Sequence, residues 1–175
     1  AGDIYECAEA ENGSSVDYTV YKTKLGKRYD MEGLCYDPVT NALLLPVKSP
    51  LKKKKRDRRE IFSFSLRSKT LDKEPRFVLE ESTLESTPDG NFDPSSIEYN
   101  PASKTFFLLA AQGHAILELS ASGEVLGQVA LNKEHFFQPE GLTFTPDGRL
   151  IISSEGDKKE KLSAFITVFS PLKRK

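Results

Sequence analysis

The sequence is poor in residues that build covalent or metal-centred frameworks. It has two cysteines, Cys7 and Cys35, and two histidines in 175 residues. Two cysteines are too few for a disulfide framework, and they do not indicate whether the protein lies in an oxidising or a reducing compartment. We expect them to be separate buried thiols. No apolar run approaches the roughly 20 residues of a membrane helix, so we expect no transmembrane segment. No signal-like segment precedes the globular pattern after Ala1, which favours an absent upstream part.

Motifs of the common enzyme classes are also missing. The sequence contains no Gly-x-Ser-x-Gly elbow, no His-Glu-x-x-His, no P-loop and no dinucleotide fingerprint. His114 and His135 have no metal-ligand spacing and no evident nucleophile beside them, so we expect ordinary loop residues. The sequence therefore leaves any catalytic residue unknown.

Short β-strands account for the apolar residues that are present. With 38% hydrophobic and 29% charged residues, the composition is typical of one globular domain. Residues 61–66 alternate apolar and polar side chains, residues 106–111 form a short apolar run, and turn motifs such as Pro-Asp-Gly separate such segments. These patterns predict antiparallel strands, and no segment has the periodicity of an amphipathic helix.

A nine-residue pattern occurs three times and aligns without gaps. Each copy ends in proline and is followed by a turn and an apolar strand. The starting residues lie 63 and then 45 positions apart, and about 45 residues is the period of a four-stranded propeller blade. The copies are residues 30–38, 93–101 and 138–146.

The repeat predicts an all-β fold, a β-propeller of about three to four four-stranded antiparallel blades in one domain, residues 1–175. Two blades are expected to be complete, one nearly complete and one half present. The expected parts are the end of a preceding blade (1–29), a blade with a basic loop at 48–60 (30–80), a second blade (93–131) and the last blade (138–170). The ring closes either with an N-terminal portion outside this chain or by pairing of residues 18–25 with the last blade.

The motifs resemble those of the SdiA-regulated family of bacterial propeller proteins. The resemblance rests on Glu-Gly-Leu-Cys-Tyr-Asp-Pro at 32–38, on Gln-Pro-Glu-Gly at 138–141 with Pro-Asp-Gly at 146–148, and on Ser-Glu-Gly at 154–156. It implies the C-terminal portion of a five- or six-bladed propeller, similar to NHL-repeat and phytase-like proteins. It also implies an extracytoplasmic location, in the periplasm or at the bacterial surface, with membrane attachment only through an absent lipoprotein anchor. The resemblance transfers a fold and no defined activity.

Acidic residues at the start of the repeat are the main candidate site. Glu32 and Glu140 share one repeat position at the entrance to the innermost strand, which faces the axial channel of a propeller. Carboxylates gathered there suit calcium, because hard cations prefer oxygen ligands. Capping of turns by the same side chains is the alternative interpretation. The expected metal ligands are Asp30, Glu32, Glu140 and Glu155, and Asp93 and Gln138 are expected to bind a ligand.

A basic run is the second candidate. Residues 52–59 hold four lysines, three arginines and one aspartate, whereas the whole chain has a net charge of −1. The run is expected to be an exposed loop, either simply solvated or binding anions at its surface, and no interleaved aromatic residue supports specific nucleic-acid binding. The anion-binding candidates are Lys52, Lys53, Lys54, Lys55, Arg56, Arg58 and Arg59.

Two functional classes remain open. The first is a noncatalytic extracytoplasmic module that binds a small ligand, an ion or a protein partner across the propeller face. The second is a calcium-dependent hydrolase acting on a phosphoester or a lactone.

Overall fold

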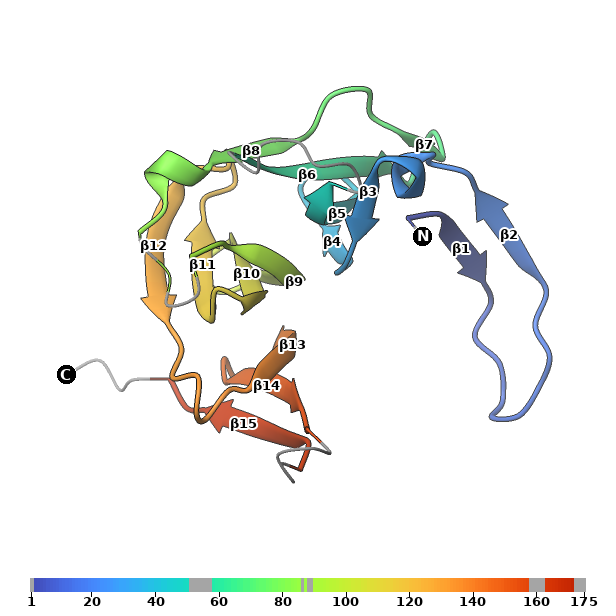
Figure 1. The fold of residues 1–175 in the computed structure, drawn as a ribbon. Helices are drawn as coiled ribbons and strands as arrows, with labels where there is room; N and C mark the ends of the chain where they lie inside the picture. The colour runs from blue at the N-terminus through green and yellow to red at the C-terminus, as the bar shows by residue number, and fades with distance from the viewer. Residues whose placement is uncertain (1, 51–57, 86, 88–89, 158–162, 172–175) are drawn as a thin grey trace.

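The computed structural model describes residues 2–50, 58–85, 87, 90–157 and 163–171. These residues form four antiparallel β-sheets that follow one another around an arc (Figure 1). The predicted all-β propeller architecture is confirmed. No helix in the described part of the chain has the length and hydrophobicity needed to span a membrane.

The N-terminal sheet is a hairpin of two strands. β1 (Ile4–Cys7) pairs with β2 (Tyr18–Tyr21). Pairing of residues 18–25 with the last blade is therefore wrong for β2, which takes β1 as its neighbour. Ile4 and the Tyr21 ring pack against Phe64 of the next sheet, with the two ring centroids 5.5 Å apart.

The next sheet has four strand positions, and both of its edges are broken by irregular segments. Its inner edge consists of two short strands and its outer edge of two more, and a register shift between Asp30 and Met31 makes the pairing at the inner edge irregular. In order from the inner edge, the strands are β3 (Tyr29–Met31) with β4 (Cys35–Asp37), β5 (Ala42–Pro50), β6 (Arg58–Ser65), and β7 (Thr70–Leu71) with β8 (Phe77–Glu80). The short 3-10 turns η1 (Leu25–Lys27) and η2 (Glu81–Thr83) flank this sheet.

Two further sheets complete the described array. Their innermost strands, β9 and β13, begin at the first residues of the second and third repeat copies. The middle sheet consists of β9 (Asp93–Asn100), β10 (Thr105–Gln112), β11 (Ala115–Leu119) and β12 (Val125–Ala130), and the last of β13 (Gln138–Phe144), β14 (Leu150–Glu155) and β15 (Phe165–Phe169).

One face of the middle sheet forms a core with the preceding sheet. Leu108 of β10 and Leu117 of β11 are opposite each other and fully buried. They belong to one cluster with Leu44 and Ile61. Burial of a leucine side chain stabilises a fold by about 1.5–3 kcal/mol, so this contact is a main source of stability.

The other face of the middle sheet packs on the last sheet. Successive side chains of a strand point to opposite faces, so Leu109 and Ile116 face away from Leu108 and Leu117. They cluster with Leu142 and Ile152. The apolar run in β10 is therefore explained by burial on both faces.

The turn after each repeat copy contains one residue with a left-handed backbone. Asn41, Lys104 and Gly148 have φ angles of 51°, 58° and 81°. Asparagine and glycine accept this conformation readily, whereas a lysine does so at some cost in free energy. The shared geometry reverses the chain between the first and second strand of each unit.

The two cysteines are separate thiols in different surroundings. Cys35 is buried, and burial together with the negative charge of Glu98 raises the pKa of its thiol to about 12. Cys7 is exposed on β1, so the expectation of two buried thiols is wrong for Cys7. Its strand belongs to a two-stranded hairpin, which offers no second layer to cover it.

Candidate functional site

Strand pairing brings the ends of the second strands beside the starts of the innermost strands. Asp93 of β9 is opposite Gln112 of β10, and Gln138 of β13 is opposite Glu155 of β14. In the first four-stranded sheet, Asp30 is opposite Ser49. Because β9 packs against β5 and β13, these three ends lie along one inner edge of the array (Figure 1).

A cavity of about 270 Å³ opens at this edge, and we call it the axial pocket. Its lining comes from three sheets and combines one ammonium, one carboxyl, two amides and an aromatic ring. The lining residues are Lys48, Ala111, Gln112, Phe137, Gln138 and Glu140. A mixture of hydrogen-bonding groups beside a ring suits a small polar ligand.

Lys48 is the internal counter-ion of the nearby acids. Its Nζ lies 2.8 Å from Oε1 of Glu32. The hydrogen bond to Glu32 raises the pKa of Lys48, and the negative charges of Glu32, Glu140 and Asp30 raise it further. The positive charge of Lys48 thus partly neutralises three of the four carboxylates expected as metal ligands.

Glu140 experiences more negative than positive surroundings. Its pKa is raised from the ordinary value, first by burial and then by the charges of Glu32 and Glu155. A hydrogen bond with Gln138 and the charge of Lys48 act in the opposite direction. Carboxylates from two sheets therefore influence one another across the axial pocket, as like charges do at close range.

Glu32 also carries a carboxylate oxygen that no described side chain or backbone group satisfies. Its Oε2 is shielded from solvent and accepts no hydrogen bond within the described ranges, while Oε1 accepts from Lys48. A buried carboxylate oxygen without a donor is costly. Glu32 is not among the residues that line the axial pocket, so it acts on the pocket through its contact with Lys48 and through its charge on Glu140.

The carboxylates expected as metal ligands lie near a lysine. Within the described residues, no group of three or more histidine, cysteine or acidic side chains is arranged to hold a metal ion. Calcium takes six to eight oxygen ligands, and Lys48 already engages Glu32. A metal role for Asp30, Glu32, Glu140 and Glu155 therefore stays a prediction.

Asp93 occupies a different place from Asp30 and Gln138, with which it aligns in the repeat. Its side chain is buried, and Oδ1 lies 3.0 Å from a guanidinium nitrogen of Arg59. Arg59 also lies 3.0 Å from Glu81. We therefore assign Asp93 to an ion pair between neighbouring sheets rather than to the axial pocket.

The structure describes only the last two residues of the basic run. Lys52, Lys53, Lys54, Lys55 and Arg56 lie outside the described residues. Arg58 is half-exposed and its guanidinium lies 2.7 Å from Glu60, whereas Arg59 is only 3% exposed. The expectation of an exposed loop is wrong for Arg59, because it is a strand residue whose charge is paired with the buried Asp93 and the partly exposed Glu81.

Sequence reasoning missed Lys48, Gln112 and Phe137. Gln112 ends β10 opposite Asp93, Lys48 lies two residues before the end of β5 and next to Ser49, the partner of Asp30, and Phe137 immediately precedes the third repeat copy. A comparison of the last few residues of each second strand would have found Lys48 and Gln112. Phe137 could be assigned to the pocket only from the tertiary packing, since an aromatic residue in that position was equally compatible with the core.

The histidines do not contribute an evident catalytic pair. His114 is buried, and its Nε2 lies 3.0 Å from the carbonyl oxygen of Phe137. The exposed His135 packs edge-on against the ring of Phe136. The turn placement expected for His114 agrees with its backbone.

The family is settled by the sequence between β6 and β15. The SdiA-regulated family model matches residues 67–165, which is more than half of the chain. The chain belongs to the SdiA-regulated family. No curated protein matches the sequence.

Solved structures similar to this SdiA-regulated chain are propellers of low sequence identity. A chain of the nidogen/laminin complex has a TM-score of 0.57 and 15% identity, over 88% of this chain and 49% of its own length. The luciferin-regenerating enzyme has a TM-score of 0.54 and 13% identity, over 97% and 58%. A protein from Lactobacillus plantarum has a TM-score of 0.50 and 12% identity, over 97% and 53%.

These similarities concern the fold alone. This chain spans about half the length of each of the three structures. Their activities and partners are therefore not transferred with the architecture, since one fold carries many unrelated functions.

Proposed function

We propose that this chain is a noncatalytic binding module whose axial pocket takes a small ligand with a positive charge. The observation that carries the proposal is the group of carboxylates around one lysine: Glu140 lines the pocket, and the charges of Glu32 and Glu155 act on it. A cationic donor in the pocket would be attracted by these carboxylates. The two amides of Gln112 and Gln138 would orient the rest of the ligand.

The balance of charge supports a cation. Asp30, Glu32, Glu140 and Glu155 influence the pocket, and among the residues that the structure describes Lys48 is the one cation that lines it. A second positive charge would oppose the charges of Glu32 and Glu155, which add to the effect of burial in raising the pKa of Glu140. An organic amine fits better than calcium. A few oxygen acceptors satisfy an ammonium group, whereas calcium takes six to eight oxygen ligands.

The location is part of the proposal. The family resemblance implies a place outside the cytoplasm, where a propeller face would meet extracellular or periplasmic ligands. Fractionation of bacterial cells that produce the full-length protein tests this, and recovery from the cytoplasm would contradict it.

A calcium-dependent hydrolase is the second candidate. The raised pKa of Glu140 favours it, since a carboxyl that holds its proton to higher pH suits general acid–base chemistry. One similar propeller is the luciferin-regenerating enzyme, which shows that the architecture is compatible with catalysis. Phosphoester and lactone turnover that needs calcium and disappears in Glu140→Gln would support this candidate.

Calorimetric titration at low ionic strength tests the binding module. Putrescine is the organic probe and calcium chloride the inorganic one. We expect putrescine to bind more tightly than calcium, and Glu32→Gln to weaken putrescine binding by about tenfold, because one negative charge near the pocket is lost. Lys48→Met should strengthen putrescine binding, since the internal counter-ion is removed.

Glu98→Gln is the matched control. Glu98 lies on β9, and burial raises its pKa as it does for Glu140, yet it does not line the axial pocket. Its replacement should leave putrescine affinity unchanged. The proposal would be contradicted if neither probe gave heat of binding, or if Glu32→Gln bound putrescine as tightly as the unmodified chain. Tighter binding of calcium than of putrescine would mean that the ligand is a metal ion and not an organic cation.

A further inference from the structure

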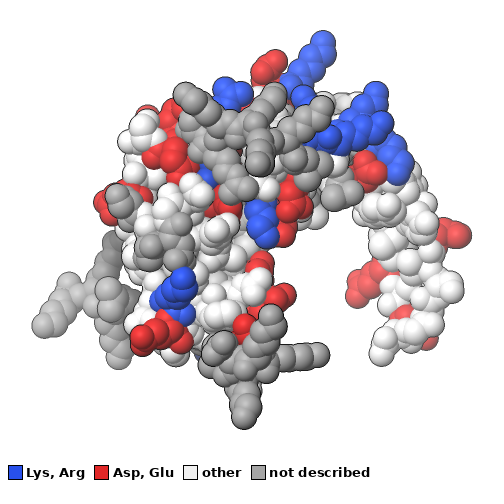
Figure 2. All heavy atoms as spheres, in the orientation of Figure 1, with Lys and Arg blue, Asp and Glu red and all other residues white. Residues whose placement is uncertain are grey.

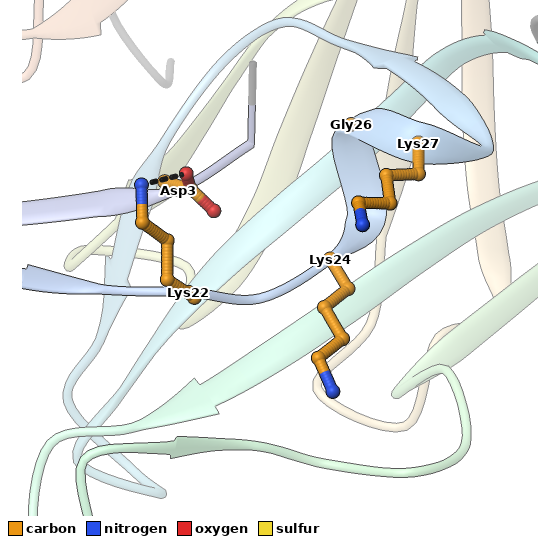
Figure 3. A pocket seen from close by; sticks show the side chains of 5 residues that line it. All are labelled: Asp3, Lys22, Lys24, Gly26 and Lys27. Atoms are coloured by element: carbon orange, nitrogen blue, oxygen red, sulfur yellow. Dashed lines mark hydrogen bonds and ion pairs between the residues drawn. The ribbon is translucent and has the colours of Figure 1, made fainter.

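A second cavity, lined mainly by lysines, lies near the N-terminal hairpin and is separate from the axial pocket. It is a cavity of about 460 Å³ beside η1, lined by Asp3, Lys22, Lys24, Gly26 and Lys27 (Figure 3). It shares no residue with the axial pocket. We call it the lysine pocket.

The lysine pocket carries an uncompensated positive charge. Nζ of Lys22 lies 2.9 Å from Asp3, so these two charges neutralise each other. Lys24 and Lys27 make no ion pair with any residue in the described ranges, and Figure 3 shows both side chains separate from the Lys22–Asp3 pair. Two ammonium groups around one cavity attract an anion.

The turn that carries these lysines is anchored in the core. Leu25, between Lys24 and Gly26, is fully buried and packs with Val47 and Phe62. The backbone N–H of Leu25 donates to the hydroxyl of Thr23 over 3.1 Å. The Cα positions from which the lysines project are therefore held by packing and hydrogen bonding.

Two further contacts hold the opposite wall. The hydroxyl of Thr23 donates to the carbonyl oxygen of Gly2 over 2.6 Å, and the Thr23 N–H donates to Oδ1 of Asp3 over 3.2 Å. Lys24 has a left-handed backbone with φ 64°, a conformation that is unfavourable for lysine and is held here by the anchored turn.

We infer that the lysine pocket binds the phosphate group of a small free ligand. Lysine is a compact charge with three donors, which suits tetrahedral phosphate oxygens. The cavity is within the size range of small-molecule sites, so it has room for a group attached to the phosphate. Basic atoms gather over this part of the surface in Figure 2, near the hairpin side of the first four-stranded sheet. This inference is independent of the function proposed for the axial pocket.

Calorimetry with inorganic pyrophosphate tests the inference. We expect the unmodified chain to bind it, with an affinity that falls as sodium chloride is raised. The double variant Lys24→Asn, Lys27→Gln should bind at least about tenfold more weakly, because two charged donors are lost. Asparagine is chosen at position 24 because it accepts a left-handed backbone.

Lys104→Asn is the matched control. Lys104 also has a left-handed backbone, with φ 58°, and lies in a turn outside the lysine pocket. Its replacement should leave pyrophosphate affinity unchanged. If the double variant does not fold, as judged by circular dichroism, Lys27→Gln alone serves and should still weaken binding.

Three results would overturn the inference. They are the absence of pyrophosphate binding by the unmodified chain, equal binding by the lysine variants, and equal loss in Lys104→Asn. Sedimentation with phosphatidic acid vesicles distinguishes the source of the phosphate. Binding to these vesicles without binding of pyrophosphate would replace the small free ligand by a lipid headgroup and overturn the inference as stated.

Discussion

The middle and last sheets differ in how their third strands are covered. β11 lies between two strands and two neighbouring sheets, and four of its five residues are buried. β15 is the outermost strand of its sheet, and Ile166 and Val168 on it are 68% and 49% exposed. Both strands are strongly apolar in sequence. Position in the array therefore decides what an apolar strand contributes to stability.

The largest expected difference is between Leu117 and Val168. Leu117→Ala should lower the free energy of unfolding by about 3 kcal/mol, because it opens a cavity in a fully buried cluster. Val168→Ala should change it by only about 0.5 kcal/mol, as at other exposed positions. Urea denaturation followed by circular dichroism measures both. Equal losses would break the comparison and indicate that β15 is covered in solution, which light scattering would detect as association.

A smaller difference is expected between Asp93 and Gln138, which share a repeat position. Asp93→Asn should cost about 2–3 kcal/mol in the free energy of unfolding, because Arg59 stays buried with one carboxylate fewer. The cost lies at the lower end for a buried ion pair, since Glu81 still faces Arg59. The exposed Gln138 should tolerate alanine within about 0.5 kcal/mol.

Urea denaturation of the two variants under one buffer condition decides this case. A stable Asp93→Asn variant with weakened putrescine binding would place Asp93 in the axial pocket after all. A destabilised Gln138→Ala variant would mean that the pocket edge is part of the core.

The smallest expected effect is the change in folding stability with pH that comes from two carboxyl groups, Glu98 in the middle sheet and Glu140 in the last sheet. Both have pKa values raised in the folded state, first by burial. The folded chain then holds these protons to higher pH than the unfolded chain, so stability falls as pH rises from about 4.5 through the raised pKa. Glu98→Gln and Glu140→Gln should each reduce the loss of stability as pH rises. Below about pH 4.5 the stability of each variant should not change with pH differently from that of the unmodified chain.

A ligand should separate the two carboxyls. The charges of Glu32 and Glu155 also raise the pKa of Glu140, whereas such charges do not act on Glu98. Putrescine should therefore lower the pKa of Glu140 and leave that of Glu98 in place. Carboxyl carbon shifts in an NMR titration report both values, and a parallel change would show a general salt effect.

Much of the architecture was predictable because its signals are local. The copies that begin at Asp93 and Gln138 coincide with the starts of β9 and β13, since turn residues and alternating side chains act within a few positions. The apolar character of β10 was visible as well. Its division into a Leu108 face and a Leu109 face follows from strand geometry once sheets are known to flank both sides.

The candidate site was predictable only in part. Glu32 and Glu140 were chosen from their repeat position, and the structure brings their charges within reach of each other. Lys48 was not chosen, because its role depends on a register shift beside Asp30 and on the approach of β13. The assignment of Asp93 failed because the same repeat position faces a buried arginine in one sheet and the pocket edge in another.

The sequence by itself determined the repeated antiparallel strands and the membership of a propeller family. It also determined where acidic and basic residues recur. Only the tertiary structure decided that Lys48 neutralises Glu32, that Arg59 is buried against Asp93, and that Lys24 and Lys27 share a cavity. The reason is physical: strand formation depends on neighbours in sequence, whereas burial and charge pairing depend on groups that only folding brings together.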